Sequence, residues 1–381
     1  RLYRDDAWAA PFARLRREDP VHYHPESPFG PYWSVTRYAD IMKVELDHGT
    51  YSSAQELGGI QITDQAKGSE RPSFIRMDPP RHTAQRKTVA PIVAPTNLAN
   101  MEGLIRERTA RVLDGLPRNE TFDWVDLVST ELTAMMLATL FDFPQADRRK
   151  LTHWSDVAIA NIEDEDAVVK SEAERTAELM QMAEIMAALW KERAAQPPKF
   201  DLISMMAHGE ATQNMPLPEF IGTFGLLIVG GNDTTRNSMT GGLMAVVDQP
   251  QELDKVRADA ALLPSLVSEV IRWQSPVIHM RRTARHDTEL AGKTIRAGDK
   301  VVMWYVSGNR DETSIPEPDR FLVGRPKARQ HLSFGAGVHR CVGDRLAEMQ
   351  LRILWEEILR RDLQIEIMGP PVRLYSNFIR G

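Results

Sequence analysis

Cysteine and long apolar runs are both scarce in this chain. Cys341 is the only cysteine among 381 residues, so no disulfide can form within the chain. This composition fits a reducing compartment, and we expect a cytoplasmic protein. The most apolar runs, 134–141 and 224–229, fall far short of the roughly 18 uncharged residues that a membrane span needs. We therefore expect no membrane-spanning helix.

An excess of positive charge is also missing. The chain carries 47 Lys and Arg against 53 Asp and Glu, a net charge of -6, which argues against a general nucleic-acid binder. Neither H-E-x-x-H nor G-x-S-x-G occurs, and Asp287 stands where a phosphate loop ending in Lys293-Thr294 would need glycine. His22 and His24 have no third metal ligand nearby and are interpreted as ordinary strand residues. Because the chain starts at Arg1 and stops in mid-pattern at Gly381, we expect it to be trimmed at both ends.

Hydrophobic periodicity predicts a mainly helical protein from about Pro79 onward. No regular alternation of strands and helices occurs, which argues against a TIM barrel or a doubly wound sheet. The segment 51–78 has little helical period and is interpreted as a lid or binding loop. The sequence thus predicts a large mainly α fold with small β-sheets. Strands are expected at 22–24, 32–35 and within 276–304, and helices at 8–16, 80–92, 98–115, 125–141, 148–161, 166–194, 217–246, 249–258, 262–273 and 342–360.

The strongest chemical signal surrounds Cys341. It lies in Phe334-Gly335-Ala336-Gly337-Val338-His339-Arg340-Cys341-Val342-Gly343, just before an amphipathic helix. At such a loop-to-helix junction the helix amides and the positive end of the dipole favour a thiolate. Gly337 and Gly343 permit close approach of a flat cofactor. A lone cysteine is usually a small buried apolar residue, but these neighbours at fixed spacing favour a cofactor ligand.

This segment resembles the haem-binding signature of the cytochrome P-450 superfamily, F-x-x-G-x-H-x-C-x-G. The resemblance implies a helical lobe and a smaller β-containing lobe around a buried haem b, within one catalytic domain spanning 1–381. It makes Cys341 the axial ligand of the haem iron. It places His339 against a haem propionate and Phe334 near the sulfur, with Gly335, Gly337 and Gly343 shaping the haem-binding loop. One departure is Glu348, where many members carry Arg.

A long predicted helix, 220–246, is interrupted by Gly230-Gly231-Asn232-Asp233-Thr234-Thr235. The helix either ends at Gly230 and starts again, or opens locally beside a ligand. Leu226, Val229, Gly230 and either Asp233 or Thr234 would share one face. The segment is similar to the oxygen-binding groove of the same superfamily, [AG]-G-x-[DE]-T. By that resemblance Asp233 and Thr234 are catalytic and deliver protons.

Further landmarks follow in the order expected for the superfamily. Glu269-x-x-Arg272 resembles its E-x-x-R helix motif, and Arg320 would complete a structural Glu-Arg-Arg network. Alone, such spacing usually marks a surface ion pair. Three cations resemble propionate contacts of bacterial members, because a buried dianionic haem edge needs positive partners: His82, Arg86 and Arg282.

The resemblance implies a monooxygenase that uses O2 and two electrons. No flavin or iron–sulfur domain fits in the chain, so we expect ferredoxin and an NAD(P)H-dependent ferredoxin reductase as partners. A basic face would attract an acidic ferredoxin; its candidates are Arg86, Lys87, Arg340, Arg345 and Arg352.

Three stretches, 56–62, 74–80 and 374–378, resemble the bacterial alkane terminal hydroxylases. They suggest an apolar small-molecule substrate and ω-hydroxylation of medium-chain alkanes or fatty acids. The expected pocket residues are Leu226, Val229, Gly230, Ile278 and Phe378. The alternatives are another small apolar substrate such as a terpenoid, a peroxide-driven enzyme, and a non-catalytic haem-based gas sensor.

Overall fold

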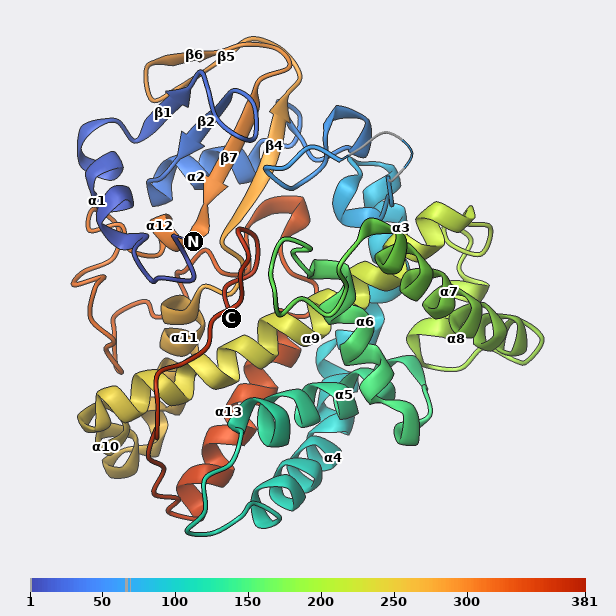
Figure 1. Cartoon of the computed structure of the whole chain (residues 1–381), viewed down its shortest axis with the longest axis vertical. Coiled ribbons are helices and arrows are strands. Elements are labelled where there is room, and N and C mark those ends of the chain that lie inside the picture. The colour runs from blue at the N-terminus through green and yellow to red at the C-terminus, as the bar shows by residue number, and fades with distance from the viewer. Residues whose placement is uncertain (1, 66–67, 69) are drawn as a thin grey trace.

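The computed structural model describes residues 2–65, 68 and 70–381. Helices dominate this part of the chain, as the periodicity predicts, and the small sheets lie together in one part of the molecule (Figure 1). The helices are α1 (Ala9–Glu18), α2 (Tyr38–Leu46), α3 (Arg81–Val89), α4 (Pro95–Asp114), α5 (Glu131–Phe141), α6 (Arg149–Ile159), α7 (Glu172–Ala194), α8 (Leu202–His208), α9 (Leu217–Asp248), α10 (Pro250–Ala258), α11 (Leu263–Gln274), α12 (Tyr305–Gly308) and α13 (Asp344–Arg360). A π-helical turn, Val125–Thr130, leads into α5.

The larger sheet has the strand order β1-β2-β7-β4-β3, and β5 pairs with β6 in a separate hairpin. Only the β2–β7 pair is parallel within the larger sheet. Strand β7 is buried along its whole length, which places its apolar residues in the core between β2 and β4. The expected mainly α fold with small sheets is confirmed. The strands are β1 (Val21–His24), β2 (Tyr32–Val35), β3 (Tyr51–Ser52), β4 (His279–Ala284), β5 (Thr288–Leu290), β6 (Lys293–Ile295) and β7 (Lys300–Trp304).

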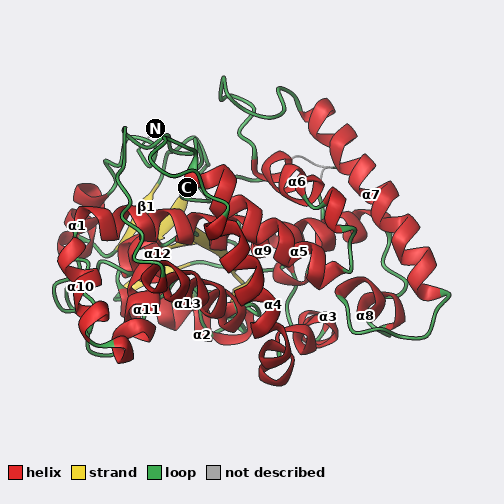
Figure 2. Ribbon diagram, turned by 90° about the horizontal axis from the view of Figure 1, so that it is seen from below, coloured by secondary structure: helices red, strands yellow, loops and turns green. Residues whose placement is uncertain are grey.

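Helix α9 runs through the middle of the molecule and contacts α5, α6, α7, α11 and α13 (Figures 1 and 2). It is continuous, so both interpretations of a break at Gly230 are wrong. Packing overrides the poor helix propensity of its glycines. A Cβ on Gly231 would lie 2.8 Å from Leu137 of α5, and one on Gly242 would lie 2.7 Å from Val270 of α11. These glycines allow the neighbouring helices to approach closely.

Several local predictions differ from the structure. Helices α2, α8 and α12 were not expected, and the helix predicted at 166–194 begins only at Glu172. Ser171 caps it there, since its hydroxyl accepts a hydrogen bond from the Glu174 N–H at 3.1 Å. The segment 51–78 holds β3 and the short 3-10 turns Gln55–Leu57 and Phe74–Arg76, while its residues 66, 67 and 69 lie outside the described residues. Among the described residues, no helix has the length and apolarity to cross a membrane.

Both ends of the described chain lie on the same side of the molecule (Figures 1 and 2). Asp6 makes ion pairs with Arg373 and Arg380 of the C-terminal segment, each at 3.3 Å. The last residues also pair with the residues just before β4, where the Arg380 N–H donates to the Pro276 carbonyl at 2.8 Å. The C-terminal segment is therefore held against the centre of the fold.

Candidate functional site

Glycine geometry fixes the loop before Cys341. Gly335 and Gly337 have φ of 64° and 63°, in the left-handed region that favours glycine. A Cβ on Gly337 would lie 2.5 Å from the Glu45 carbonyl oxygen of α2, so this position has no room for a side chain. The Cys341 N–H donates to the Phe334 carbonyl at 2.8 Å, which closes the loop just ahead of α13.

Cys341 retains exposed surface, although protein atoms surround it closely enough to desolvate its sulfur. Burial raises the pKa of the Cys341 thiol to about 11, and a hydrogen bond from the Gly343 N–H acts in the opposite direction. Desolvation of the Cys341 sulfur by the polypeptide therefore outweighs the helix-end effect that the sequence predicts. A bound metal cation would reverse this balance, because it deprotonates a coordinating thiol.

Two histidines meet beside this loop. The rings of His82, on α3, and His339 have centroids 4.3 Å apart, and none of their four nitrogens has a partner among the described residues. Burial lowers the pKa of His82 to about 4, and burial together with Arg282 holds that of His339 well below its usual range. Buried polar atoms without a protein partner, next to arginines, are suited to hydrogen bonding with an anionic group.

Arg86 and Arg282 complete this cluster in different ways. Arg86 makes no ion pair with any residue that the structure describes; burial lowers its pKa, while nearby Cys341 acts to raise it. Arg282 donates to Glu45 at 2.9 Å and to the Arg281 carbonyl at 2.8 Å, so much of its charge is already compensated. Tyr305 also donates to Glu45. Sequence reasoning missed Glu45 because it lies on α2, a helix that was not predicted.

These residues fit the haem that the sequence resemblance implies. Cys341 offers a sulfur ligand with exposed surface, and His82, His339 and Arg86 offer unsatisfied groups at the edge of the same site. Arg282 would join them through its remaining donor capacity. A donor set of one thiol, two arginines and two histidines with unpartnered nitrogens suits an iron porphyrin with two propionates.

The middle of α9 exposes one face even though the helix is central. Gly230 is exposed, and Leu226, Val229 and Thr234 are partly exposed. The Thr234 hydroxyl donates to the Gly230 carbonyl at 2.9 Å, one turn back along the helix. This face is apolar apart from Thr234, as the sequence pattern predicts.

Asp233 does not share that face. Consecutive residues of an α-helix point about 100° apart, so Asp233 and Thr234 cannot face the same space. Asp233 is fully buried and accepts hydrogen bonds from Ser155 of α6 at 2.7 Å and from Arg236 at 2.5 Å. The sequence left open whether Asp233 or Thr234 lies on the face with Leu226 and Gly230. In the structure, Thr234 lies there.

Asp233 connects to solvent through its partners. Arg236 also binds Asp156 at 2.8 Å, and both of these residues line an open groove of about 1320 Å³ between α9, the α6–α7 connection and the C-terminal segment. Burial raises the pKa of Asp233 to about 6, while the Arg236 charge opposes this rise. The carboxyl group can therefore exchange a proton near neutral pH.

The two remaining pocket candidates differ in their surroundings. Ile278 has no exposed surface and packs in an apolar cluster with Tyr3, Ile62 and Val302, so it cannot serve as an exposed pocket wall in this structure. Phe378 is partly exposed, and its ring lies 5.4 Å from that of His279. The sequence could not separate them, since apolarity alone does not tell a core residue from a pocket residue.

The predicted Glu-Arg-Arg network exists with a different third member. Arg272 donates twice to Glu269, at 2.7 and 2.8 Å, and Arg325 donates to the same carboxylate at 3.1 and 3.2 Å. Arg320 instead has a side chain that is 63% exposed and pairs with Glu317 at the surface. The assignment of Arg320 is wrong, because only its backbone carbonyl reaches Arg272 and Arg325.

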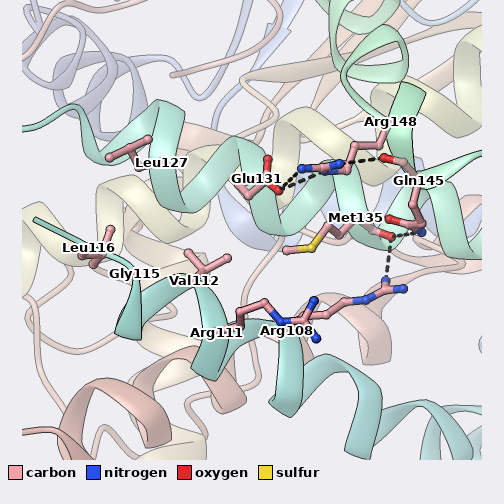
Figure 3. Close-up of a pocket in the computed structure, with 10 residues that line it drawn as sticks. All are labelled: Arg108, Arg111, Val112, Gly115, Leu116, Leu127, Glu131, Met135, Gln145 and Arg148. Carbon is pink, nitrogen blue, oxygen red and sulfur yellow. Dashed lines mark hydrogen bonds and ion pairs between the residues drawn. The ribbon is translucent and has the colours of Figure 1, made fainter.

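A separate surface hollow of about 390 Å³ lies between α4 and α5 (Figure 3). None of the site residues predicted from the sequence lines it. Arg148 bridges Glu131 and the Gln145 carbonyl there, and Arg108 donates to the Met135 carbonyl at 2.9 Å. These bonds hold α5 to its neighbours, so the polar side chains around the hollow have a structural role.

Comparison with known proteins agrees with this geometry. The cytochrome P-450 family model matches residues 31–365. Linalool 8-monooxygenase of Pseudomonas putida is 38% identical, over 97% of this chain and 92% of its own length. A methyl-branched lipid omega-hydroxylase of Mycobacterium tuberculosis is 34% identical, over 99% and 90%. The solved structure of cytochrome P-450-153 from Novosphingobium aromaticivorans superposes with a TM-score of 0.93 at 47% identity, over 100% of this chain and 95% of that one.

Proposed function

Because the chain belongs to the cytochrome P-450 family and is a haem-dependent monooxygenase, we propose that it hydroxylates the terminal carbon of medium-chain alkanes or fatty acids. The observation that carries this proposal is the exposed face of α9. Leu226 and Val229 are the large side chains there, and Thr234 is the only polar one. Such a surface binds an aliphatic chain through apolar contact and offers it no charged partner.

The relatives support an extended apolar substrate. One is a hydroxylase that acts at the ω position of a methyl-branched lipid, and another is a monooxygenase of linalool at carbon 8. A terpenoid such as linalool is therefore the second candidate substrate, favoured by the 38% identity to that enzyme. The two candidates share the same apolar recognition and differ in the length and branching of the chain.

The reaction consumes one O2, two electrons and two protons, and converts R–H into R–OH and water. Haem with a thiolate ligand supplies the O2 and C–H chemistry. Thr234 can bind a water through the lone pairs that its bond to Gly230 leaves free, and can pass a proton from its Oγ1. Asp233 holds the exchangeable proton on the other side of α9, where it pairs with Arg236, which in turn pairs with Asp156 at the groove.

We further propose that the electrons come from a ferredoxin that is reduced by an NAD(P)H-dependent reductase. Two of the arginines expected to form the basic face are already engaged in ion pairs. Arg340 is paired with Asp344 at 2.9 Å, and Arg352 is paired with Glu102 and Glu356, each at 2.8 Å. Arg345 is exposed and makes no ion pair with a described residue. Arg345 is thus a better candidate for a free docking charge than Arg352.

Product analysis with a reconstituted ferredoxin system tests the substrate assignment. Octane should yield mostly 1-octanol, and a medium-chain fatty acid mostly its ω-hydroxy acid. The internal C–H bonds are weaker, so terminal selectivity requires the pocket to present the chain end. Mainly internal alcohols would reject terminal hydroxylation. Turnover of linalool without turnover of octane would reject the proposal in favour of the second candidate. Cys341→Ala provides the control that product formation depends on the single thiol.

Thr234→Ala tests the proton role in the same assay. The variant should consume reduced nicotinamide at a comparable rate while releasing hydrogen peroxide in place of much of the alcohol. The methyl group of alanine keeps the helix face but removes the hydroxyl that holds a proton. An unchanged yield of alcohol per electron pair would show that Thr234 has no such role.

A further inference from the structure

Two segments that are distant in sequence dock on the start of β4. One is the loop 57–64 and the other is the C-terminal segment 374–381. Each is fixed by several hydrogen bonds to this one strand or the residues just before it. The bonds run from Arg281 N–H to the Ile60 carbonyl (2.8 Å), from the Thr283 hydroxyl to the Leu57 carbonyl (2.7 Å), from Ile278 N–H to the Phe378 carbonyl (2.9 Å) and from Arg380 N–H to the Pro276 carbonyl (2.8 Å).

Among the described residues, His279 is the one side chain that binds both segments. Its Nδ1 lies 2.9 Å from the Asn377 carbonyl oxygen, and its Nε2 lies 3.0 Å from the Ile62 backbone nitrogen. A carbonyl can only accept and a backbone N–H can only donate, so the tautomer is determined: Nδ1 carries the proton and Nε2 is bare. The neutral imidazole is therefore a directional cross-link between the two segments.

The surroundings of His279 hold the ring in place. The side chain has no exposed surface, and its ring lies 5.2 Å from Trp304 of β7 and 5.4 Å from Phe378. Both nitrogens are satisfied, in contrast to the unpartnered nitrogens of His82 and His339. Burial also lowers the pKa of His279 to about 4, so the ring stays neutral near neutral pH. The cross-link is thus complete without any bound ligand.

We propose that His279 is a positioning residue for substrate, because it sets the distance between Ile62 on the loop and Phe378 on the C-terminal segment. The inference rests on the proposed function and on the sequence-based expectation that Phe378, whose side chain is partly exposed, borders the pocket for the aliphatic chain. An apolar chain has no polar group to align it, so only the walls decide which carbon is presented for reaction. Loss of the cross-link lets Phe378 shift and so admits internal carbons.

Two substitutions separate the two arms of the cross-link. In His279→Asn the side-chain amide can still reach the Asn377 carbonyl but not Ile62. In His279→Gln the longer side chain can still accept from the Ile62 N–H but does not donate at the Nδ1 position. His279→Phe keeps an aromatic ring of similar size and removes both bonds. Val302→Ala is the matched control. Val302 packs in one apolar cluster with Ile62 and Trp304, so the substitution removes buried apolar volume near His279 and leaves both of its hydrogen bonds intact.

Hydrogen–deuterium exchange of the haem-bound protein tests the cross-link directly. We expect faster exchange at Ile62 in His279→Asn, in segment 374–381 in His279→Gln, and in both in His279→Phe. In the product assay, His279→Phe should raise KM for octane on the order of fivefold, because the shifted wall contacts the chain less closely, while kcat changes less. The share of internal alcohols should rise in the same variant, whereas Val302→Ala should keep the parental exchange pattern and product ratio.

Each outcome decides the proposal. Parental exchange at both segments in all three histidine variants would overturn the cross-link. Faster exchange with an unchanged product ratio and KM would overturn the positioning role. If octane is not a substrate, the proposed function fails by itself; the exchange arm still stands, and the product ratio is read on linalool.

Discussion

Two buried carboxylates of this protein have similar partners and opposite acid–base properties. Glu269 and Asp233 are both fully buried, and each is bound by an arginine three residues later in its own helix. Nevertheless, the pKa of Glu269 is held below its usual range, while that of Asp233 is raised to about 6. Burial acts on both in the same direction, so the difference must come from the partners.

The count of cations explains the difference. Glu269 is bound by Arg272 and Arg325 and also accepts from the Leu322 N–H at 2.8 Å, so its charge is more than compensated. Asp233 has a single arginine, Arg236, and shares it with a second carboxylate, Asp156. One cation for two carboxylates leaves the buried one under-compensated. Full compensation produces a fixed structural clamp, whereas partial compensation produces a group that can exchange protons.

The largest effect is expected from breaking the compensated network. Glu269→Ala would leave two buried guanidinium groups, Arg272 and Arg325, without their carboxylate. Breaking a buried pair in this way costs about 3–5 kcal/mol, so the variant should lose most of its folded, haem-bound form. The measurement is the urea midpoint of the Soret absorbance, together with the yield of the ferrous carbonyl complex.

Matched arginine variants test the membership of that network. Arg325→Ala should be strongly destabilising, because its side chain is 3% exposed and bound to Glu269. Arg320→Ala should change stability by only about 0.5 kcal/mol or less, since its ion pair lies at the surface. Equal losses of unfolding free energy in the two variants would show that Arg320 belongs to the network, as the sequence predicted.

At Asp233, in contrast to Glu269, the buried charge is expected to lower the stability of the protein as the pH rises. A buried acid whose pKa is raised contributes stability below the pKa of the unfolded state and loses it as pH rises through the folded value. With a pKa of about 6 against an ordinary 3.8, the loss is on the order of 3 kcal/mol between about pH 4 and pH 6.5. The unfolding free energy of the parent protein minus that of Asp233→Asn should therefore fall over this range. A difference independent of pH would contradict the assignment.

Catalysis provides a second measurement on Asp233. If it relays protons, Asp233→Asn should reduce turnover by on the order of 100-fold, the lower range for loss of a proton-transfer group. Binding of octane, followed by the haem spectrum, should change little, because Asp233 points away from the exposed face of α9. Equal loss of turnover and of binding would indicate a structural role instead.

Sequence patterns predicted which residues carry the chemistry better than they predicted which distant side chains meet in the fold. Cys341 and Glu269–Arg272 were found because they lie in short motifs whose residues are fixed by local geometry. Arg325 could not be chosen over Arg320 from the sequence, since the choice depends on the path of the chain after Phe321. Glu45 was missed for a related reason, because it meets Arg282 only in the tertiary structure, 237 residues away. Long-range pairing of polar groups leaves no local pattern to find.

The smallest effect, and the sharpest test of the comparison, concerns one hydroxyl. Ser155 donates to Asp233 at 2.7 Å and acts to lower the pKa of that carboxyl. Ser155→Ala removes about 1 kcal/mol of preference for the charged form, which corresponds to about 0.7 pH units. The midpoint of the pH-dependent stability difference described for Asp233 should therefore move upward by this amount.

Ser129→Ala is the matched control: Ser129 also makes a hydrogen bond to α9, to the Thr240 hydroxyl at 2.9 Å, but it does not touch Asp233. That variant should lose similar stability at every pH and leave the midpoint in place. A similar shift of the midpoint in both variants, or in neither, would show that the pKa of Asp233 depends on general burial rather than on the balance of its partners.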